Sequence, residues 1–459
     1  MTRLLKGLFT LFVLMSAHLS AHAADDGWQA GVAQRSITPP EPIWMAGYAA
    51  RTKPSAGKVH DLWVKAVAFQ DPDGRKAVLA SVEVCGLPRD ISNAIRDELK
   101  TKLGFERGQI VLASTHTHSG PVVGTNLQPM YPLDPQQQKV VDDYAVFLKK
   151  QVVAACAEAV QDLTSATISY GFGRCGFAMN RRENAERDSE KLRGELKLKG
   201  PVDHEVPVLR ADLVYRNGKH QTAIIYGYAC HCTTLDFNKL CGDYAGFASA
   251  AIERANPGAI ALYIPGCGGD QNPAPRRTLP LAREHGEKLA WSVASVLAGP
   301  LTVVAKDSAF LSNYEEINLP FAAPPTREKL EADLKSKDGS TSRRAKMLLA
   351  QLDRDGKLTS VYPYPITVWR LDTLTRVFLG GEVTVDYSLR LKRNLDSSRL
   401  WVSAYCNAVM CYIPSQRVLK EGGYEGATSM IYYGQPTVWA DGIEERIIDG
   451  VARGVEAVR

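Results

Sequence analysis

Two histidines spaced as His-x-His are the residues of this sequence best suited to chemistry. His116 and His118 follow directly after a short apolar run, residues 109–114, that predicts a buried strand. Along an extended backbone, alternate side chains point to the same side, so both imidazoles would face one centre unless a turn separates them. A strand-end His-x-His can hold zinc through imidazole nitrogens. Two hydrogen-bonded surface histidines are the alternative interpretation.

Three further polar residues also follow predicted strands. His231, Glu382 and Asp270 each come soon after an apolar run, in segments rich in glycine or small polar residues. Taken singly, they are also typical of a core histidine, a helix-capping carboxylate and a turn-forming aspartate. Ligand sites in α/β proteins collect at strand ends, where a rigid scaffold can aim the loops. The joint occurrence of these residue types at strand ends therefore favours one functional site.

The elements expected around these residues indicate the fold class. Strand and helix signals alternate without a strict βαβ rhythm. We therefore expect an α/β fold, in which a mixed β-sheet core is flanked by helices, in a single large domain. The expected strands are residues 64–69, 76–84, 109–114, 206–215, 221–230, 259–264, 367–371 and 375–379, and the expected helices are residues 90–103, 135–163, 286–297 and a charged, solvated stretch within 322–358.

The first 23 residues predict a secretory signal peptide. Arg3 and Lys6 form a positive n-region, residues 8–15 are apolar, and Ala21-His-Ala23 is a small-x-small cleavage signal. This apolar stretch is too short to span a bilayer, and no later stretch approaches the ~20 apolar residues of a transmembrane helix. We therefore expect residues 24–459 to be exported, either to a periplasm or to the medium, without a transmembrane segment.

Composition and charge narrow the class of partner. The chain has 459 residues, of which 45% are hydrophobic and 23% charged, as is typical of a globular protein. The formal net charge is +5, without the basic stripe that binding to nucleic acid needs. The sequence therefore argues against a nucleic-acid partner. Nine cysteines, an odd number, leave at least one thiol without an intrachain partner, and we interpret some as small buried apolar residues.

Several motifs occur in the order found in the neutral ceramidase family, which the chain resembles over nearly all of residues 24–459. The Thr-His-Thr-His-Ser-Gly-Pro run is the most specific, and the ordered set is more specific than any single member. The segment 31–39 also resembles the first strand of that family. The motifs are Ala113-Ser-Thr-His-Thr-His-Ser-Gly-Pro121, Cys230-His-Cys-Thr-Thr234, Gly242-Asp-Tyr-Ala-Gly246, Gly269-Asp-Gln-Asn-Pro273, Gly381-Glu-Val-Thr384 and Tyr424-Glu-Gly-Ala-Thr-Ser429.

The resemblance implies a neutral ceramidase-like catalytic domain over residues 24–459, with Zn²⁺ as cofactor. It also implies a small-molecule or lipid substrate with an N-acyl group. The zinc of that family is held by two histidines, one glutamate and one tyrosine. Matched residue by residue, the corresponding side chains here are His116, His231, Glu382 and Tyr412.

The resemblance also implies residues that act on the substrate. His118 takes the place of a catalytic or substrate-contacting residue, and its near-neutral free pKa makes it the best candidate for a general acid. Arg181 matches an arginine that contacts the substrate, and Tyr424 matches a tyrosine on the substrate side. Asp270 is expected to act indirectly, by orienting a ligand or ordering its loop.

Two departures from the family pattern bear on the activity. Asn272 occupies the position of the family's proposed catalytic serine. Asparagine cannot be a nucleophile of this kind, although its amide can donate a hydrogen bond to an oxyanion. The β-sandwich that follows in longer family members is expected to be absent. Both departures argue against ceramide itself as the substrate. All four expected zinc ligands are nevertheless present in the sequence.

The sequence therefore predicts an exported zinc-dependent hydrolase that cleaves an N-acyl amide. Because the serine is replaced, a zinc-activated water is the expected nucleophile, and Asn272, Arg181 and Tyr424 would position the substrate or stabilise its oxyanion. A non-catalytic zinc- or ligand-binding relative is one alternative. An amidohydrolase-type barrel is the other, and it ranks behind because several strands precede the His-x-His pair instead of only one.

Overall fold

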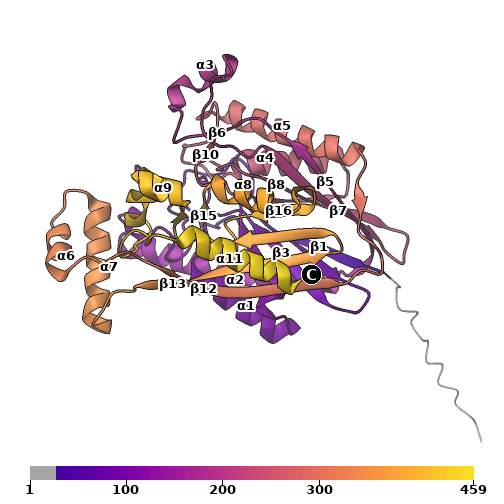
Figure 1. Cartoon of the computed structure of the whole chain (residues 1–459), viewed down its shortest axis with the longest axis horizontal. Helices are drawn as coiled ribbons and strands as arrows, with labels where there is room; N and C mark the ends of the chain where they lie inside the picture. The colour runs from indigo at the N-terminus through magenta and orange to yellow at the C-terminus, as the bar shows by residue number, and fades with distance from the viewer. Residues whose placement is uncertain (1–26) are drawn as a thin grey trace, which may run out of the picture.

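A computed structural model describes residues 27–459, so the expected signal peptide, residues 1–23, lies outside the described residues. Two main β-sheets form the body of the molecule (Figure 1). The larger sheet has the strand order β4 (Ile110–Ser114), β3 (Lys76–Val82), β2 (Trp63–Gln70), β1 (Gln29–Ser36), β5 (Thr164–Arg174), β7 (Glu205–Val214), β8 (His220–Tyr228) and β9 (Ile260–Pro265), with β11 (Thr302–Val303) paired to β5.

The smaller sheet has the order β12 (Phe310–Pro320), β13 (Val361–Leu371), β14 (Leu374–Leu379) and β16 (Leu400–Ser403). Both sheets mix parallel and antiparallel pairs. Two short ladders, β6 (Ala178–Asn180) with β10 (Gln271–Pro273) and β15 (Glu382–Val383) with β17 (Tyr412–Ile413), lie outside these sheets.

Helices cover the outer faces of both sheets. α1 (Arg89–Leu103) and α2 (Pro135–Gln161) pack on the β1–β4 half of the larger sheet, and α4 (Asp243–Ala255) and α5 (Leu279–Ala298) pack on the β7–β9 half. α8 (Val385–Asn394) and α11 (Ile443–Ala457) cover the smaller sheet. The other helices are α3 (Ser189–Gly194), α6 (Arg327–Asp333), α7 (Gly339–Asp355), α9 (Gln416–Glu421) and α10 (Gly423–Gly426).

The alternation of side chains along the strands explains this layering. In β2, Val64 and Ala66 pack toward α1 and α2, whereas Val67 and Phe69 point to the opposite face. That opposite face meets the smaller sheet in a shared core, which includes Trp369. Burying apolar side chains on both faces of the larger sheet is the main force that holds the two sheets together.

The larger sheet is curled but open. Ser81 of β3 donates a hydrogen bond to the carbonyl of Tyr263 in β9 at 2.6 Å, although the two strands are not neighbours in the ladder. Strands β4 and β9 end the sheet without pairing to each other. The expected mixed α/β sheet flanked by helices is confirmed, with a second sheet that the sequence did not indicate. An amidohydrolase-type barrel is excluded, because the sheet does not close.

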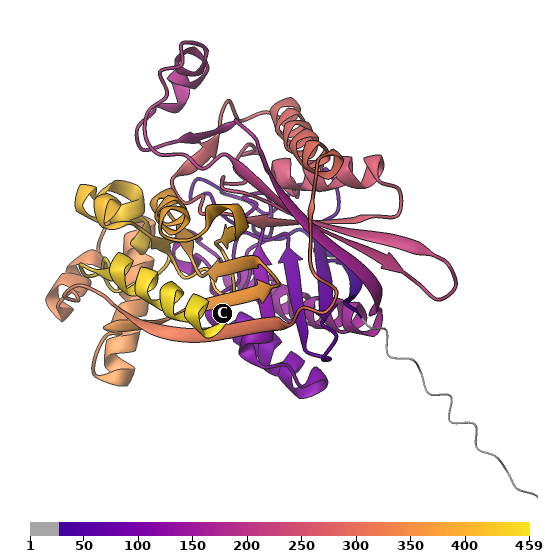
Figure 2. The same ribbon diagram turned by 45° about the vertical axis from the view of Figure 1, so that its right-hand side comes forward.

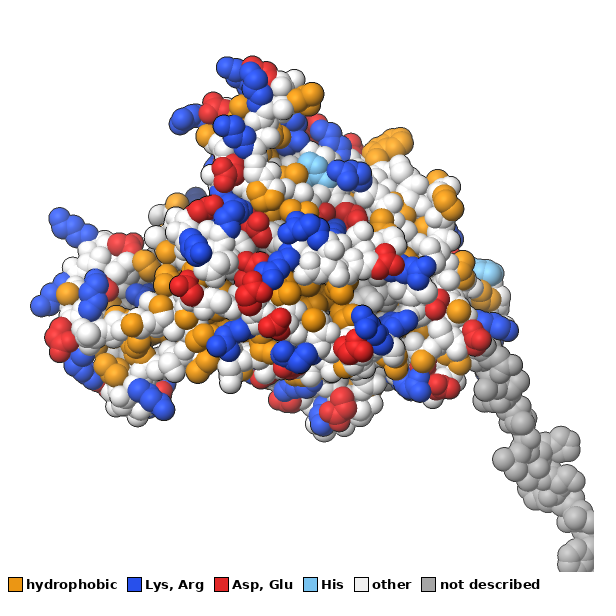
Figure 3. Space-filling model, viewed as in Figure 1, with side chains coloured by type: hydrophobic (Ala, Val, Ile, Leu, Met, Phe, Trp, Pro, Cys, Tyr) orange, Lys and Arg blue, Asp and Glu red, His pale blue; other side chains and the backbone are white. Residues whose placement is uncertain are grey.

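Two segments project from this body in Figures 1 and 2: the turn that carries α3, and the pair α6 and α7. The latter pair forms most of the charged stretch expected within residues 322–358. Lys, Arg, Asp and Glu side chains are interspersed over the face shown in Figure 3. Among residues 27–459, no helix combines the length and the apolarity of a membrane span. All nine cysteines are buried, and none forms a disulfide.

The segments that follow several strands meet at one edge of the molecule. After β4, Thr117 forms a parallel bridge with Cys232, which follows β8. The backbone N–H of Gly269, after β9, donates to the carbonyl of Val383 at 2.9 Å. Loops that follow β4, β8, β9 and β14 are therefore tied directly to one another by backbone hydrogen bonds. This edge holds the residues singled out in the sequence.

Close packing of α2 on β1 gives a prediction for stability. A Cβ at Gly31 would lie 2.1 Å from the carbonyl oxygen of Ala159, so Gly31→Ala forces the helix away from the sheet. We expect Gly31→Ala to lower the free energy of unfolding by about 1–3 kcal/mol, as overpacking does. Gly194→Ala is the matched control, because nothing lies within 4 Å of its added Cβ. Urea denaturation followed by tryptophan fluorescence measures both, and equal midpoints would contradict the packing argument.

Candidate metal centre and substrate cleft

Three buried side chains from distant parts of the chain meet at this edge. The Nε2 atoms of His116 and His231 each lie 2.9 Å from Oε2 of Glu382. All three residues are buried, and their ligand atoms lie within 4.8 Å of one another. The structure therefore brings three of the four residues expected as zinc ligands around one centre.

Backbone geometry after the strands aims these side chains. His116 has a φ of 62°, in the left-handed region, so the chain turns there instead of continuing extended as the alternation argument assumed. Gly381 has a φ of 73°, and a Cβ there would lie 2.7 Å from a side-chain carbon of Ile413. Glycine has no Cβ, so it adopts a positive φ readily and leaves room for the Ile413 side chain. The glycine before Glu382 is therefore a requirement of the turn that brings this carboxylate to the centre.

Hydrogen bonds behind the two imidazoles decide what fits between them. Nδ1 of His116 donates to the carbonyl of Cys85, and Nδ1 of His231 donates to the carbonyl of Gly268, both at 2.6 Å. In these tautomers each Nε2 presents a lone pair to Glu382, whose Oε2 has no hydrogen-bond donor among the described residues. Three lone pairs in contact repel one another unless a cation lies between them. Two imidazoles and a carboxylate are a donor set that suits zinc.

The same centre moves the pKa values of its groups apart. Burial opposes a charged His116, but the Glu382 carboxylate raises the pKa of His116 to about 10. Burial, and then the positive charge of Arg181, lower the pKa of His231 to about 4. Burial would raise the pKa of Glu382, yet the two imidazoles hold it well below its usual range. The carboxylate therefore requires one positive partner, which is a proton on His116 or a metal ion.

Tyr412, the fourth expected ligand, lies beside this centre. Its hydroxyl is 3.1 Å from Nε2 of His231 and accepts a hydrogen bond from Nη2 of Arg181 at 3.0 Å. Its ring is nearly parallel to the His231 imidazole, with 14° between the planes. Burial raises the pKa of the Tyr412 hydroxyl, whereas Arg181 opposes that shift. Arg181 is thus placed to stabilise a tyrosine oxygen that carries negative charge.

His118 lies in the same pocket but outside the set of three. Its Nε2 is 3.1 Å from Nε2 of His116, and its Nδ1 is buried without a partner in the part of the chain described. Gly47 makes room for the ring, because a Cβ there would lie 2.3 Å from that Nδ1. The ring of Tyr48 contacts it edge-on, with 5.0 Å between centroids. Burial and the two other imidazoles lower the pKa of His118 well below its usual value, so it is neutral.

A cleft of about 640 Å³ opens above this centre, and the other expected residues line it together with His118. Nη1 of Arg181 donates to Oδ1 of Asn272 at 3.1 Å, and the hydroxyl of Thr233 donates to the same oxygen at 3.4 Å. Within residues 27–459, the amide nitrogen of Asn272 has no hydrogen-bond acceptor, so it is free to donate. The half-exposed ring of Tyr424 contacts the ring of Tyr412, with 5.4 Å between centroids.

Two residues at the centre carry no signal in the sequence. Tyr433 donates a hydrogen bond to Oε1 of Glu382. The thiol sulfur of Cys85 lies 3.8 Å from Nδ1 of His116, and these two residues form a second group of potential ligands with His118. Neither Tyr433 nor Cys85 stands in a recognisable pattern, so only the folded chain reveals them.

Glu425 also joins the site, and here the sequence did carry a signal. It follows Tyr424 in a motif already singled out. Its Oε1 accepts from Nε of Arg181 and its Oε2 from Nη1 of Arg182, both at 2.7 Å. Glu425 therefore fixes the arginine that holds both Tyr412 and Asn272.

Asp270 orders the loop behind the site. Its Oδ1 accepts from the backbone N–H of Val385 at 2.8 Å, and its Oδ2 accepts from the side-chain amide of Asn180 at 3.2 Å. Burial raises the pKa of Asp270 to about 6. Asp270 thereby ties the start of α8, just after Glu382, to β6, just before Arg181. Of its two expected roles, this geometry favours ordering of the loop.

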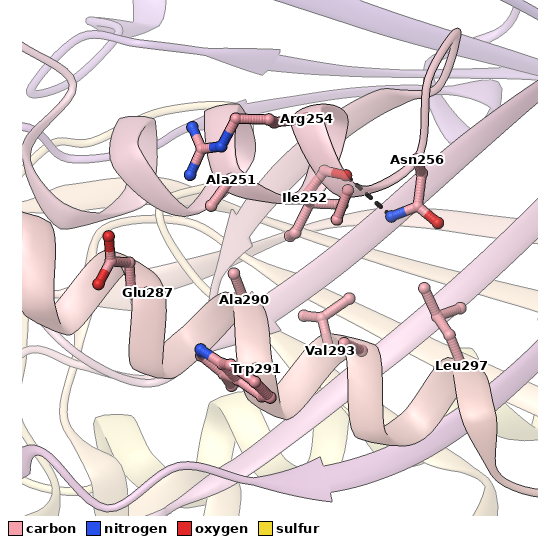
Figure 4. A pocket seen from close by; sticks show the side chains of 11 residues that line it. Ala251, Ile252, Arg254, Asn256, Glu287, Ala290, Trp291, Val293 and Leu297 are labelled. Carbon is pink, nitrogen blue, oxygen red and sulfur yellow. Dashed lines mark hydrogen bonds between the residues drawn. The ribbon is translucent and has the colours of Figure 1, made fainter.

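Figure 4 shows a second hollow, of about 480 Å³, between α4 and α5. Its walls are mainly apolar and include Val293, Leu297 and the largely exposed Trp291. Arg254 and Glu287 are its charged lining residues. None of the clustered histidines borders this hollow. The residues suited to catalysis gather instead at the cleft above the candidate metal centre.

Residues 28–266 match a family model described as neutral/alkaline non-lysosomal ceramidase, N-terminal. The match covers more than half of the chain. This protein belongs to that family. The matched range includes His116, His118 and His231, whereas Glu382 and Tyr412 lie beyond it.

Relatives and solved structures extend the likeness. The chain is 25% identical to neutral ceramidase B of Dictyostelium discoideum over 245 residues, or 50% of this chain and 32% of that protein. It is 25% identical to neutral ceramidase of Pseudomonas aeruginosa over 278 residues, or 57% of this chain and 39% of that protein. The chain thus spans about a third of the length of these curated relatives.

The crystal structure of the Pseudomonas aeruginosa neutral ceramidase superposes with a TM-score of 0.65 at 19% identity, covering 87% of this chain and 70% of that one. A structure described as ceramidase complexed with C2 gives 0.67 at 17% identity, covering 89% and 73%. At these identities the likeness concerns the fold, and it supports the mixed α/β architecture.

Replacing the central carboxylate tests whether the centre holds a metal. Glu382→Gln keeps the shape of the side chain but removes the charge that a cation needs. We expect the wild-type protein to bind about one zinc ion per chain and Glu382→Gln to bind it at least ~10–100-fold more weakly. Equilibrium dialysis with elemental analysis measures this. Glu444→Gln, a buried carboxylate outside the centre, is the control, and equal zinc content in both variants would contradict the assignment.

Proposed function

We propose that this protein is a zinc-dependent hydrolase that cleaves the amide bond of an N-acyl compound. The observation that carries the proposal is the centre itself, in which two imidazole nitrogens face one carboxylate oxygen that has no hydrogen-bond donor among the described residues. The centre lies beneath a cleft large enough for a substrate. Membership of the ceramidase family, and relatives named neutral ceramidase, support an amide as the bond cleaved.

Zinc held by His116, His231, Glu382 and Tyr412 would lower the pKa of a bound water from ~15.7 towards ~7 and polarise a substrate carbonyl. In the overall reaction the C–N bond breaks, the water oxygen joins the acyl carbon, and the leaving nitrogen gains a proton. The residues around the centre therefore have two tasks: they hold the carbonyl group, and they move that proton.

His118 is placed to move the proton. It is neutral and its Nδ1 has no partner among the described residues, so it can take up a proton as a base and return it to the leaving nitrogen as an acid. Its contacts with Gly47 and Tyr48 fix the ring without occupying that nitrogen. His118 thereby supplies the proton transfer that amide cleavage requires.

Asn272 is placed to stabilise the oxyanion. Because Arg181 and Thr233 both donate to its Oδ1, the side-chain amide is oriented with its nitrogen toward the cleft. A fixed N–H donor of this kind stabilises charge as it develops on a carbonyl oxygen. This role does not need the serine that the family pattern has at this position.

Export is part of the same proposal. The positive n-region, apolar run and cleavage signal within residues 1–23 support secretion of the rest of the chain. An amide hydrolase outside the cytoplasm would meet substrates that arrive from the surroundings.

Replacing His118 tests the proton transfer. We expect His118→Ala to lower kcat on an N-acyl substrate by roughly 10²–10⁴-fold, as loss of a general acid–base does, while the zinc content stays the same. Stopped assays on the zinc-loaded variant, with elemental analysis of the same sample, measure both quantities. Loss of zinc from His118→Ala would make this histidine a ligand and overturn its assignment.

Asn272 tests the proposed function against a non-catalytic binding role. We expect zinc-loaded wild-type protein to hydrolyse a chromogenic N-acyl anilide, a chelator-stripped sample to be inactive, and added zinc to restore turnover. Asn272→Ala should slow the reaction about 10²–10³-fold through loss of one oxyanion donor. An inactive wild-type protein that gains turnover through Asn272→Ser would reject the water mechanism and favour the binding relative.

A further inference from the structure

Charged, aromatic and polar side chains together line the cleft above the candidate metal centre. Few lining residues offer only hydrocarbon, among them Met179 and Pro273. Pressing an alkyl chain on the amine side of the amide against these charged groups would strip their water without replacing the hydrogen bonds, which is unfavourable. Pockets for long apolar ligands are lined mainly by apolar side chains. The charged lining residues are Arg181, Arg182, Arg276, Glu186 and Glu425.

Three arginines and two glutamates line this wall. Two carboxylates outside the lining complete the ion pairs, because Glu421 pairs with Arg182 and Asp236 pairs with Arg277. Glu425 is shared between Arg181 and Arg182, with both contacts at 2.7 Å. Glu186 is shared between Arg276 and its neighbour Arg277, with both contacts at 2.6 Å. Each carboxylate is therefore divided between two guanidinium groups. A zinc ion in the centre below would make the potential in the cleft more positive.

Arg276 is the cation best placed to accept an anion from outside. Nη1 of Arg276 donates to the carbonyl of Thr233 at 3.1 Å, and its other contacts go to Glu186, whose side chain is 37% exposed. Nη1 and Nη2 each carry a second N–H that these contacts do not use. Arg181, by contrast, is committed through all three of its nitrogens to Glu425, Asn272 and Tyr412.

The position of Arg276 tells which part of the substrate it would meet. Arg276 lines the cleft together with Tyr48 and His118. The Tyr48 ring in turn contacts His118, which serves the leaving nitrogen. Arg51 adds positive charge on the same side: it donates to the His118 carbonyl at 2.7 Å and has no ion-pair partner within residues 27–459. An anion bound at Arg276 would therefore belong to the amine side of the amide.

We propose that the substrate is an N-acyl compound with a carboxylate beside the amide nitrogen, such as an N-acyl amino acid, and that Arg276 binds this carboxylate. This proposal rests on the proposed amide hydrolase function. Hydrolysis of such a compound releases a fatty or short-chain acid and a free amino acid. A guanidinium fork matches a carboxylate through two parallel N–H donors, which a neutral alcohol or amide cannot use in the same way.

Three substrates with matched chemistry test the proposal on the full zinc-loaded protein. N-octanoylglycine carries the carboxylate, N-octanoylethanolamine replaces it by a hydroxymethyl group, and ceramide in detergent micelles represents the two-chain lipid. We expect kcat/KM for N-octanoylglycine to exceed that for N-octanoylethanolamine by about 10–100-fold. Cleavage of the ethanolamide or of ceramide at an equal or higher rate would overturn the proposal while leaving the hydrolase function intact. Failure to cleave any of the three would overturn both.

Variants of neighbouring arginines separate recognition from folding. Arg276→Met should raise KM for N-octanoylglycine and bring the ratio between the two octanoyl substrates close to one, and Arg276→Lys should restore part of it. Arg277→Met is the matched control, because Arg277 shares Glu186 but does not line the cleft, and it should keep the ratio of the wild type. If Arg276→Met keeps the wild-type ratio of kcat/KM between the two octanoyl substrates, Arg276 does not bind the carboxylate.

Discussion

Mutual repulsion between three buried lone-pair atoms is the constraint on which the rest of the site depends. Two backbone carbonyls accept the Nδ1 protons of His116 and His231, so a neutral imidazole cannot donate to Glu382, and an additional proton on His116 or a metal ion is needed to relieve the contact. Holding such atoms 2.9 Å apart needs a rigid frame. Backbone hydrogen bonds between the loops after β4, β8, β9 and β14, together with the left-handed turn at His116, provide that frame. A cation converts the same repulsion into attraction.

One arginine connects this centre to the cleft. Arg181 donates to the hydroxyl of Tyr412 on one side and to Oδ1 of Asn272 on the other, while Glu425 neutralises part of its charge. Its position depends on β6, which pairs with β10, and on Asp270, which links β6 to the start of α8. Asn272 and Tyr412 are therefore linked to each other through a single guanidinium group.

Local pattern was sufficient to predict much of the sheet edge but not the architecture around it. The ends of the strands before His116, His231 and Glu382 could be predicted from the sequence, because buried strands are short apolar runs bounded by polar residues. The smaller sheet was predicted only in part: residues 367–371 and 375–379 lie in β13 and β14, whereas β12 was missed, since most of its side chains are half-buried and buried residues alternate with exposed ones only around Ile317 and Leu319. The role of Tyr433 could not be predicted from the sequence for a related reason. Its contact with Glu382 joins residues 51 positions apart and exists only in the folded chain.

Replacement of serine by asparagine at residue 272 is consistent with the electrostatics of the cleft. A hydroxyl at this position would accept hydrogen bonds from Arg181 and Thr233 and would offer one O–H donor of its own. The side-chain amide of Asn272 accepts through its oxygen and still presents two N–H donors. In a wall already rich in guanidinium groups, this adds a neutral donor that does not need a carboxylate partner. In the proposed function, Asn272 would therefore add a donor that faces a substrate oxygen, and the nucleophile would be supplied at the centre formed by His116, His231 and Glu382.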